Sequence, residues 1–337
     1  MAAIRTSDLR GKGVEMPENT KLSQTASILT LTLNPALDMA SSVPVMVPDE
    51  KLRCSEPQLD PGGGGLNVSR AVHALCGESL ALVALGGLTG DRLAELIRRE
   101  GVMFLGITGP GETRQSLTVN EASTGRQYRF MLPGPIWQDE DQDRVFMLLR
   151  AAGKPGGFAV ISGSQPPGVP IDFPAKLAAA MRGMRVVLDT SGSALTQAVE
   201  NPIPDLEVLR MDGEEAEALA GRKLETRADT ADFAQALVAR GVARKVIVAR
   251  GADGSVLADA TTRIFAKAPK VQVKSKVGAG DSFVGGYVLA LARGQSEGEA
   301  LSQGVAAAAA AVMSDATELC SAEDVARLLP EAVVSEV

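Results

Sequence analysis

Apolar and polar positions alternate regularly over the second half of the chain. Four short apolar runs are separated by stretches with helical periodicity, and they span Phe158–Ser162, Arg185–Asp189, Leu206–Leu209 and Lys245–Ala249. Such strand–helix alternation is typical of a mostly parallel sheet with helices on both faces and right-handed crossovers. The pattern therefore predicts a three-layer α/β domain, in which ligands bind beyond the carboxyl ends of the strands.

The first half of the chain adds strands to this sheet. Ser27–Leu33 and Ser79–Leu85 are β-rich, and a helix is expected near Asp91–Glu100. The carboxyl ends of the strands form the ligand-binding edge of such a sheet. The polar residues expected at this edge are Asp38, Ser162 and Asp189.

Other early segments do not fit the alternation. We expect the chain near residues 42–60 and 112–133 to form a small second sheet that covers the ligand-bearing edge as a lid. The open edge of that sheet needs protection, which favours a homodimer formed through the lid. The extended pieces and the β-hairpin that predict it are Val43–Val47, Lys51–Pro57, Arg114–Glu121 and Arg126–Leu132.

Composition narrows the class of partner. Hydrophobic residues make up 45% of the 337 positions and aromatic residues only 3%, so Ala, Val and Leu must build the core. A net charge of −7 argues against nucleic acid or an anionic membrane as the main partner. The three cysteines are scattered, without disulfide or zinc spacing. His73 is the only histidine, so Ser-His or Cys-His catalysis is disfavoured.

The first 26 residues differ from the rest of the chain. They are polar and lack the apolar stretch of a secretory signal, so we expect a flexible extension followed by one domain over residues 27–337. The sequence contains no apolar run long enough to span a bilayer. These features favour a cytoplasmic protein.

A glycine-rich turn near the C-terminus is the first candidate site. Val277–Ser282 places Gly278, Ala279 and Gly280 directly before Asp281 and an apolar helix. Free N–H groups and the helix dipole at such an end bind anions, and a carboxylate there can take a proton from an attacking hydroxyl. The alternative is that Asp281 is an ordinary first-turn acid that stabilises the helix dipole.

A second glycine-rich element lies far upstream. Pro61–Arg70 contains four consecutive glycines and then enters an amphipathic segment. Backbone without side chains in this run, next to Asn67 at a helix start, suits close contact with a polyhydroxylated ligand. The alternative is a flexible hinge.

With both glycine elements placed, the chain resembles the ribokinase-type (PfkB) sugar kinases, and among them the bacterial 6-phosphofructokinases. The resemblance extends roughly over Ile28–Leu329 and implies a ribokinase-like kinase domain with a β-sheet lid. The motifs that carry it are Leu31–Asp38, Lys51–Cys54, Pro61–Asn67, Gly125–Phe130, Ile161–Ser164, Pro166–Gly168 and Val277–Asp281.

The resemblance implies roles for individual residues. Asp281 would activate the sugar hydroxyl, and the N–H groups of Gly278, Ala279 and Gly280 would bind the transferring phosphoryl group. The implied substrate-binding residues are Asp38, Lys51, Arg53, Gly63, Gly64, Asn67, Arg114 and Ser162. Among these the cations would hold the phosphate already on the substrate, a task suited to the planar donor fork of Arg. The alternative is that the cations are solvated surface charges.

The resemblance further implies ATP as phosphoryl donor with Mg²⁺, and it allows a monovalent cation. Asp212 and Glu215 match the positions of an Asn and a Glu in the family, so they would hold Mg²⁺ largely through waters. Alternatively, they are two acids that open a helix. The implied nucleotide-binding residues are Asp212, Arg250, Gly251, Gly254, Lys276, Gly278 and Gly280.

On the nucleotide side the chain departs from the family pattern. Arg210-Met211 replaces Lys-Pro, Lys276 replaces Thr, and Asp315–Cys320 stands where a Gly-Thr-Arg-like turn is expected. Arg250 replaces a smaller or uncharged residue. Lys276 either neutralises nucleotide phosphates, fills the space that they need, or belongs to a basic strand exposed to solvent.

The leading hypothesis is ATP-dependent phosphorylation of the C1 hydroxyl of fructose 6-phosphate, giving fructose 1,6-bisphosphate. Two close alternatives are a tagatose-6-phosphate kinase and a 1-phosphofructokinase. Lys51 and Arg53 favour a substrate with a 6-phosphate. A non-catalytic sugar-phosphate binding protein with a degraded nucleotide site is a hypothesis of another class. A dinucleotide-dependent dehydrogenase is disfavoured, because the glycine run does not follow the first strand at the required spacing.

Overall fold

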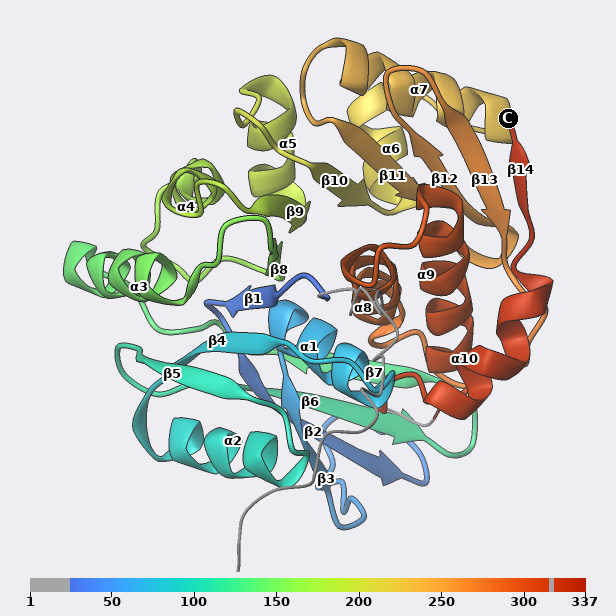
Figure 1. Cartoon of the computed structure of the whole chain (residues 1–337). Helices are drawn as coiled ribbons and strands as arrows, with labels where there is room; N and C mark the ends of the chain where they lie inside the picture. The colour runs from blue at the N-terminus through green and yellow to red at the C-terminus, as the bar shows by residue number, and fades with distance from the viewer. Residues whose placement is uncertain (1–24, 315–317) are drawn as a thin grey trace, which may run out of the picture.

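The computed structural model describes residues 25–314 and 318–337, which form a large sheet between two helical layers and a smaller sheet beside α1 and α2 (Figure 1). The strands of the large sheet lie in the order β14-β13-β12-β11-β10-β9-β8-β1-β4-β5. From β11 to β5 all neighbours are parallel, whereas β12, β13 and β14 pair antiparallel at one edge. The predicted three-layer, mostly parallel α/β architecture is confirmed.

The strands of the large sheet are β1 Ile28–Thr32, β4 Leu80–Leu85, β5 Phe104–Thr108, β8 Phe158–Ser162, β9 Arg185–Asp189, β10 Val208–Met211, β11 Lys245–Ala249, β12 Gly254–Ala258, β13 Arg263–Lys267 and β14 Val334–Glu336. The helices are α1 Gly64–Ala74, α2 Gly87–Arg99, α3 Asp139–Ala152, α4 Phe173–Ala180, α5 Gly192–Glu200, α6 Gly213–Ala220, α7 Arg227–Ala239, α8 Ala279–Ala292, α9 Glu297–Ala311 and α10 Ala322–Leu328. Two short 3₁₀ turns, η1 Gly251–Asp253 and η2 Leu329–Glu331, complete the described elements.

Alternate side chains of each parallel strand face opposite helical layers. Leu29 and Leu31 of β1 pack in a core with α3, α4, α5 and α7. Ile28 packs in a second core with α1, α8, α9 and α10, which is rich in Ala and Val as the composition predicts. Burial on both faces explains why these strands have continuous apolar sequences.

The smaller sheet has the order β3-β2-β6-β7, with β2 Ala36–Val43, β3 Gln58–Gly62, β6 Arg114–Glu121 and β7 Gln127–Met131. It is mixed: β2 pairs antiparallel with β3 and parallel with β6, and β6 and β7 form the predicted antiparallel hairpin. Its N-terminal strands differ from the prediction. The expected pieces Val43–Val47 and Lys51–Pro57 lie almost entirely in the β2–β3 connection.

Proline explains part of this difference. Pro44 and Pro48 have no N–H to donate to a ladder, so the strand ends at Val43. The position of Asp38 also differs from the prediction. We expected it beyond the carboxyl end of β1, but the chain turns at Asn34 and Pro35 into a new strand, so Asp38 lies within β2 of the smaller sheet.

Two further elements have boundaries that differ from the predicted ones. Strand β10 lies two residues beyond the expected Leu206–Leu209. Helix α2 begins at Gly87 and not near Asp91, because the carboxylate of Glu112 accepts hydrogen bonds from the N–H groups of Leu88 and Thr89. A distant side chain thus satisfies the first turn of the helix, which a local sequence pattern cannot indicate. Among the described residues, none of the helices has the length and apolarity needed to cross a membrane.

Candidate active site

Asp281 lies in the first turn of α8. The N-cap is Gly278, whose φ of 73° is in the left-handed region that favours glycine, so the chain turns sharply into the helix. Residue 281 keeps some solvent exposure as a whole, but its carboxyl group lies among protein atoms, and Ser282 is fully buried. The helix start therefore presents a carboxylate together with N–H groups that have no acceptor within the helix.

The two glycine-rich elements meet at this carboxylate. The Asn67 amide of α1 donates a hydrogen bond from Nδ2 to Asp281 Oδ2 at 3.0 Å, across 214 positions of sequence. The Ser162 hydroxyl at the end of β8 lies 3.5 Å from Asp281 Oδ1 and 3.4 Å from Asp189 Oδ2. The structure thus brings together Asn67, Ser162, Asp189 and Asp281 from four elements.

Gly64 allows α1 to approach β8 this closely. A Cβ at this position would lie 2.5 Å from Ser162 Oγ and 2.6 Å from the backbone nitrogen of Gly163, which no side chain can tolerate. The four-glycine run is therefore a close contact between backbones, and the hinge alternative does not account for it.

Burial determines the proton affinity of Asp281. Removal from water raises its pKa to about 6, and the negative charge of Asp189 adds to this increase. The hydrogen bond from Asn67 and the charge of Arg210 act in the opposite direction. At neutral pH the carboxylate is therefore ionised but more basic than an ordinary Asp, which suits a group that accepts a proton from a hydroxyl.

Arg210, at the end of β10, lies next to the same turn. Its Nη1 pairs with Asp189 Oδ1 at 3.1 Å, and a Cβ on Gly280 would lie 3.1 Å from that nitrogen. Its Nε is buried and has no hydrogen-bond partner within the described chain. A guanidinium in this position places donors beside the free N–H groups of the α8 start.

Asp38, which is predicted to bind the sugar, lies in β2 of the smaller sheet, beside Gly62 at the end of β3. Burial raises the pKa of Asp38, while a hydrogen bond from Ser116 and the charges of Arg114, Arg70 and Arg129 oppose that increase. Strand pairing places Asp38, Ser116 and Arg129 on one face of the smaller sheet. Asp38 of β2 pairs with Ser116 of β6, Ala40 pairs with Thr118, and Thr118 pairs with Arg129 of β7.

Arg114 belongs to the same face and is half-buried, with Nε donating to the Asn34 carbonyl at 3.1 Å. Lys51 and Arg53 are exposed in the β2–β3 connection. Within the described residues, no contact joins either side chain to the carboxylates of the site. Their role in holding phosphate therefore stays a prediction.

The candidate metal residues begin α6. Asp212 Oδ1 accepts from the Glu215 N–H at 2.9 Å, and Glu215 Oε2 accepts from the Asp212 N–H at 2.8 Å. This reciprocal pairing is a capping box, so the alternative of two acids opening a helix is realised. One oxygen of each carboxylate remains outside the box. No group of three or more metal-ligating side chains occurs in residues 25–314 and 318–337.

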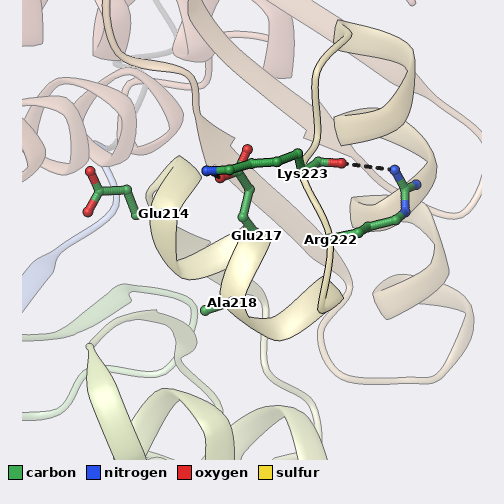
Figure 2. Close-up of a pocket in the computed structure, with 5 residues that line it drawn as sticks. All are labelled: Glu214, Glu217, Ala218, Arg222 and Lys223. Carbon is green, nitrogen blue, oxygen red and sulfur yellow. Dashed lines mark hydrogen bonds and ion pairs between the residues drawn. The ribbon is translucent and has the colours of Figure 1, made fainter.

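The outer surface of α6 carries a shallow depression (Figure 2). Glu217, Ala218, Arg222 and Lys223 line it together with Glu214, which points away from the other side chains. Lys223 pairs with Glu217 at 2.5 Å, so the charges here largely satisfy each other.

The remaining nucleotide-side residues have mixed surroundings. The Arg250 guanidinium donates to the carbonyl groups of Leu224, Glu225 and Thr226 and pairs with Asp253. It therefore anchors the α6–α7 loop to η1, and the structure gives it little freedom to bind nucleotide. Gly251 and Gly254 flank the same turn.

Lys276 is exposed, and its segment contains no strand, so the alternative of a basic strand is wrong. Within the divergent segment Asp315–Cys320, residues 315–317 lie outside the described residues.

Comparison with known proteins places this site in a family. The model of the pfkB family carbohydrate kinases matches residues 32–324, which include both glycine elements and all four side chains around Asp281. The chain belongs to the pfkB family of carbohydrate kinases. The resemblance inferred from the motifs is therefore confirmed.

Individual pfkB relatives are similar over nearly the whole chain. The ATP-dependent 6-phosphofructokinase isozyme 2 of Mycobacterium tuberculosis is 40% identical over 89% of this chain and 88% of its own length. The protein of the same description from Escherichia coli is 39% identical, over 89% and 97%. A 1-phosphofructokinase of Bacillus subtilis is more distant, at 32% identity over 92% and 100%.

A solved pfkB structure has the same fold. The crystal structure of phosphofructokinase-2 from Escherichia coli in complex with substrates and products matches with a TM-score of 0.85 and 37% identity, covering 91% of this chain and 99% of the other. The ribokinase-like fold class, including the small second sheet, is thereby confirmed.

Sequence reasoning missed three residues of this pfkB site. Asp189 was identified only as a polar strand end and Arg210 only as a departure from the family pattern, yet together they form a buried ion pair beside Asp281. Their position at the carboxyl ends of adjacent strands was the available signal. Arg129 lay inside a quoted motif, and the alternation of the hairpin could have placed it on the Asp38 face.

Proposed function

We propose that this kinase transfers the γ-phosphoryl group of ATP to the C1 hydroxyl of fructose 6-phosphate, with Asp281 as the base. The observation that carries the proposal is the hydrogen bond between Asn67 and Asp281. It joins the segment suited to a sugar with the segment suited to a phosphoryl group at one carboxylate. The names of the relatives at about 40% identity support the same assignment.

The proposed mechanism assigns a task to each group around the carboxylate. Asp281 takes the proton of the C1 hydroxyl as the hydroxyl oxygen bonds to the γ-phosphorus. The bond from that phosphorus to the β–γ bridging oxygen breaks, and ADP leaves. The N–H groups of Gly278, Ala279 and Gly280 donate to the phosphoryl oxygens, whose negative charge spreads in the transition state. Arg210 supplies a positive charge on the same side, and Asp189 holds its guanidinium in place.

The sugar phosphate would lie between α1 and the polar face of the smaller sheet. Asp38 and Asn67 would hold sugar hydroxyls beside Gly63, Gly64 and Ser162. Arg114 is the best-placed cation for the 6-phosphate, since it shares the Asp38 face. Lys51, Arg53 and Arg129 would complete the phosphate site if the β2–β3 connection and β7 lie against the substrate.

The residues present fit a magnesium ion that is held mainly by phosphates and water. Asp212 and Glu215 each keep one carboxylate oxygen outside the capping box, and burial, together with the charge of Asp212, raises the pKa of Glu215. Mg²⁺ usually binds through one or two carboxylates and substrate phosphates, not in an all-protein cage. The bound ion would neutralise charge on the nucleotide phosphates.

A monovalent cation remains an expectation without assigned residues. A solved structure of the Escherichia coli phosphofructokinase-2 with potassium is compatible with it. On the nucleotide side, Gly251, Gly254 and Lys276 remain predicted contacts, and Arg250 would take part only through its backbone.

A coupled assay with ATP, Mg²⁺ and a panel of sugar phosphates tests the function. We expect the highest kcat/KM with fructose 6-phosphate, ahead of tagatose 6-phosphate and fructose 1-phosphate. A preference for fructose 1-phosphate would move the protein to the 1-phosphofructokinases. Binding of a sugar phosphate without turnover of any panel member would favour the non-catalytic binding protein.

We also propose a homodimer formed through the smaller sheet. The face opposite Asp38 carries Leu117 and Phe130, and the end of β7 exposes further apolar residues. Phe130, Met131 and Leu132 are 47%, 53% and 54% exposed, which favours burial against another chain. One solved structure of the Escherichia coli protein is a tetrameric inhibited form, so higher assembly is an alternative. We place the protein in the cytoplasm.

A further inference from the structure

A buried guanidinium lies directly behind the Asn67 amide. Arg70 follows Asn67 by one turn of α1, and its side chain is only 9% exposed. Its Nη1 donates to Asn67 Oδ1 at 3.1 Å and to the Pro61 carbonyl at 2.9 Å. Its Nε and Nη2 donate to the two carboxylate oxygens of Glu100 at 2.6 and 2.8 Å. Every polar edge of the guanidinium therefore has a protein acceptor.

This arrangement decides which end of the amide faces Asp281. An Asn side chain has one acceptor oxygen and one donor nitrogen, and rotation by 180° exchanges them. Because Arg70 can only donate, it requires Oδ1 on its own side. Nδ2 is then turned to Asp281 Oδ2, to which it donates at 3.0 Å. The reversed amide would set two acceptor oxygens against each other.

We propose that Arg70 is a positioning residue that locks the Asn67 amide in the orientation that stabilises the ionised form of Asp281. It acts through Asn67 and does not touch the reacting atoms. The inference rests on the proposed function only in assuming that Asp281 works as the base. It extends that function by tracing control of the base to a residue outside the site.

Arg70 Nη1 contacts the smaller sheet as well as Asn67, because it also donates to the carbonyl of Pro61. Pro61 lies near the end of β3, directly before the glycines that lead into α1. Gly62 packs against Asp38, because a Cβ there would lie 2.0 Å from Asp38 Oδ2. Arg70 thus fixes the point where the sugar-side strand and the Asn67 helix meet.

Other charges around these groups must be separated from the effect of the amide. Asp281 faces Asp189 of β9, Arg210 of β10 and the hydroxyl of Ser162 in β8. Arg70 faces Glu100, which follows α2, and it also acts on Asp38 of β2. Arg70 substitutions made with and without the Asn67 amide therefore separate the amide orientation from the charge.

The direct test is carboxyl ¹³C NMR titration of the full chain without ligands. The Asp281 signal is assigned by its loss in Asp281→Asn. Arg70→Gln and Arg70→Met should both raise the pKa of Asp281 by about one unit, the scale of one hydrogen bond to a charged group. Arg99→Gln is the matched control, because Arg99 is an exposed arginine that pairs with Glu95 on α2, and it should leave the titration unchanged.

Two results would overturn the proposal. One is an unchanged titration of Asp281 in both Arg70 variants. The other is a shift that persists when Arg70→Met is combined with Asn67→Ala, which would show that charge and not the amide orientation is responsible. Glu100→Gln guards against misfolding as the cause: it should lower the unfolding temperature but leave the Asp281 titration in place.

Kinetics then connect the titration to catalysis. In the Arg70 variants the apparent pKa of the acidic limb of the kcat/KM profile should rise by the same amount. Activity at pH 6 should therefore fall more than activity at pH 8. An equal loss at every pH would mean that Arg70 only supports the fold and would contradict the proposal. Absence of turnover in the unmodified protein would instead refute the proposed function, while the NMR titration would still decide the role of Arg70.

Discussion

Asp281 is the residue whose environment has the clearest chemical consequence. A carboxylate with an ordinary pKa near 4 is a weak base, whereas burial beside Asp189 raises the pKa of Asp281 to about 6. The group remains ionised at neutral pH because the Asn67 amide and Arg210 favour its charge. Its basicity and its ionised fraction are therefore both high near pH 7.

This leads to a prediction for the pH dependence. Since the base must be unprotonated, kcat/KM should rise tenfold per pH unit below about 6 and level off above about 7. The measurement is the initial rate at low sugar-phosphate concentration from pH 4.5 to 9. A profile that stays flat down to pH 4.5 would show that no group with this raised pKa limits the reaction.

At the scale of elements, the contact between α1 and β8 is the most demanding. Gly64→Ala would place a Cβ 2.5 Å from Ser162 Oγ, so the helix must shift and carry Asn67 with it. We expect a loss of about 1 to 3 kcal/mol in the free energy of unfolding and a larger than tenfold loss of kcat/KM.

Gly298→Ala is the control, because an added Cβ in α9 would have only Val334 within 4 Å, at 3.8 Å. Denaturant unfolding and steady-state kinetics measure both effects. Unchanged stability and activity in Gly64→Ala would contradict the close approach.

The start of α6 gives a second prediction at this scale. Glu215→Gln keeps a side chain that can complete the capping box but removes the charge proposed to serve Mg²⁺. The Mg²⁺ concentration for half-maximal activity should rise several-fold, with little change in the unfolding temperature.

Glu214→Gln changes the neighbouring acid at the surface depression of Figure 2 and should leave the Mg²⁺ dependence as it was. Equal effects of the two substitutions would remove Glu215 from the metal site.

The elements also show which boundaries the local sequence can predict. Strands β8, β9 and β11 have the predicted boundaries, because strands buried on both faces have continuous apolar sequences. The start of α2 was wrong because Glu112, a distant residue, provides its cap. Asp38 was assigned to the wrong sheet because the turn at Asn34 and Pro35 leads directly into a new strand.

At the scale of the whole molecule, the site lies where the two sheets and the α8 start meet. The motifs predicted which residues belong to it, and the structure brings Asn67, Ser162 and Asp281 together. The ends of adjacent strands place Asp189 and Arg210 near each other, but the sequence does not specify that they pair, and it does not indicate the Arg70–Glu100 pair.

The exposed apolar residues of the smaller sheet predict how two copies of the chain associate. If the apolar face of the smaller sheet is a subunit interface, Phe130→Asp should convert a dimer to a monomer in analytical ultracentrifugation. Leu88→Asp, at an 81% exposed residue of α2 outside that sheet, should leave the dimer in place. A dimer that persists in Phe130→Asp would locate the interface elsewhere.

Asp281, whose carboxylate lies between the two glycine elements, is the proposed base for phosphoryl transfer. The most direct measurement compares turnover with sugar-phosphate binding in Asp281→Asn, which keeps the size and hydrogen-bonding capacity of the side chain. We predict a loss of kcat of at least about a thousandfold, with the dissociation constant for fructose 6-phosphate changed less than about threefold. Full turnover in this variant would contradict the account.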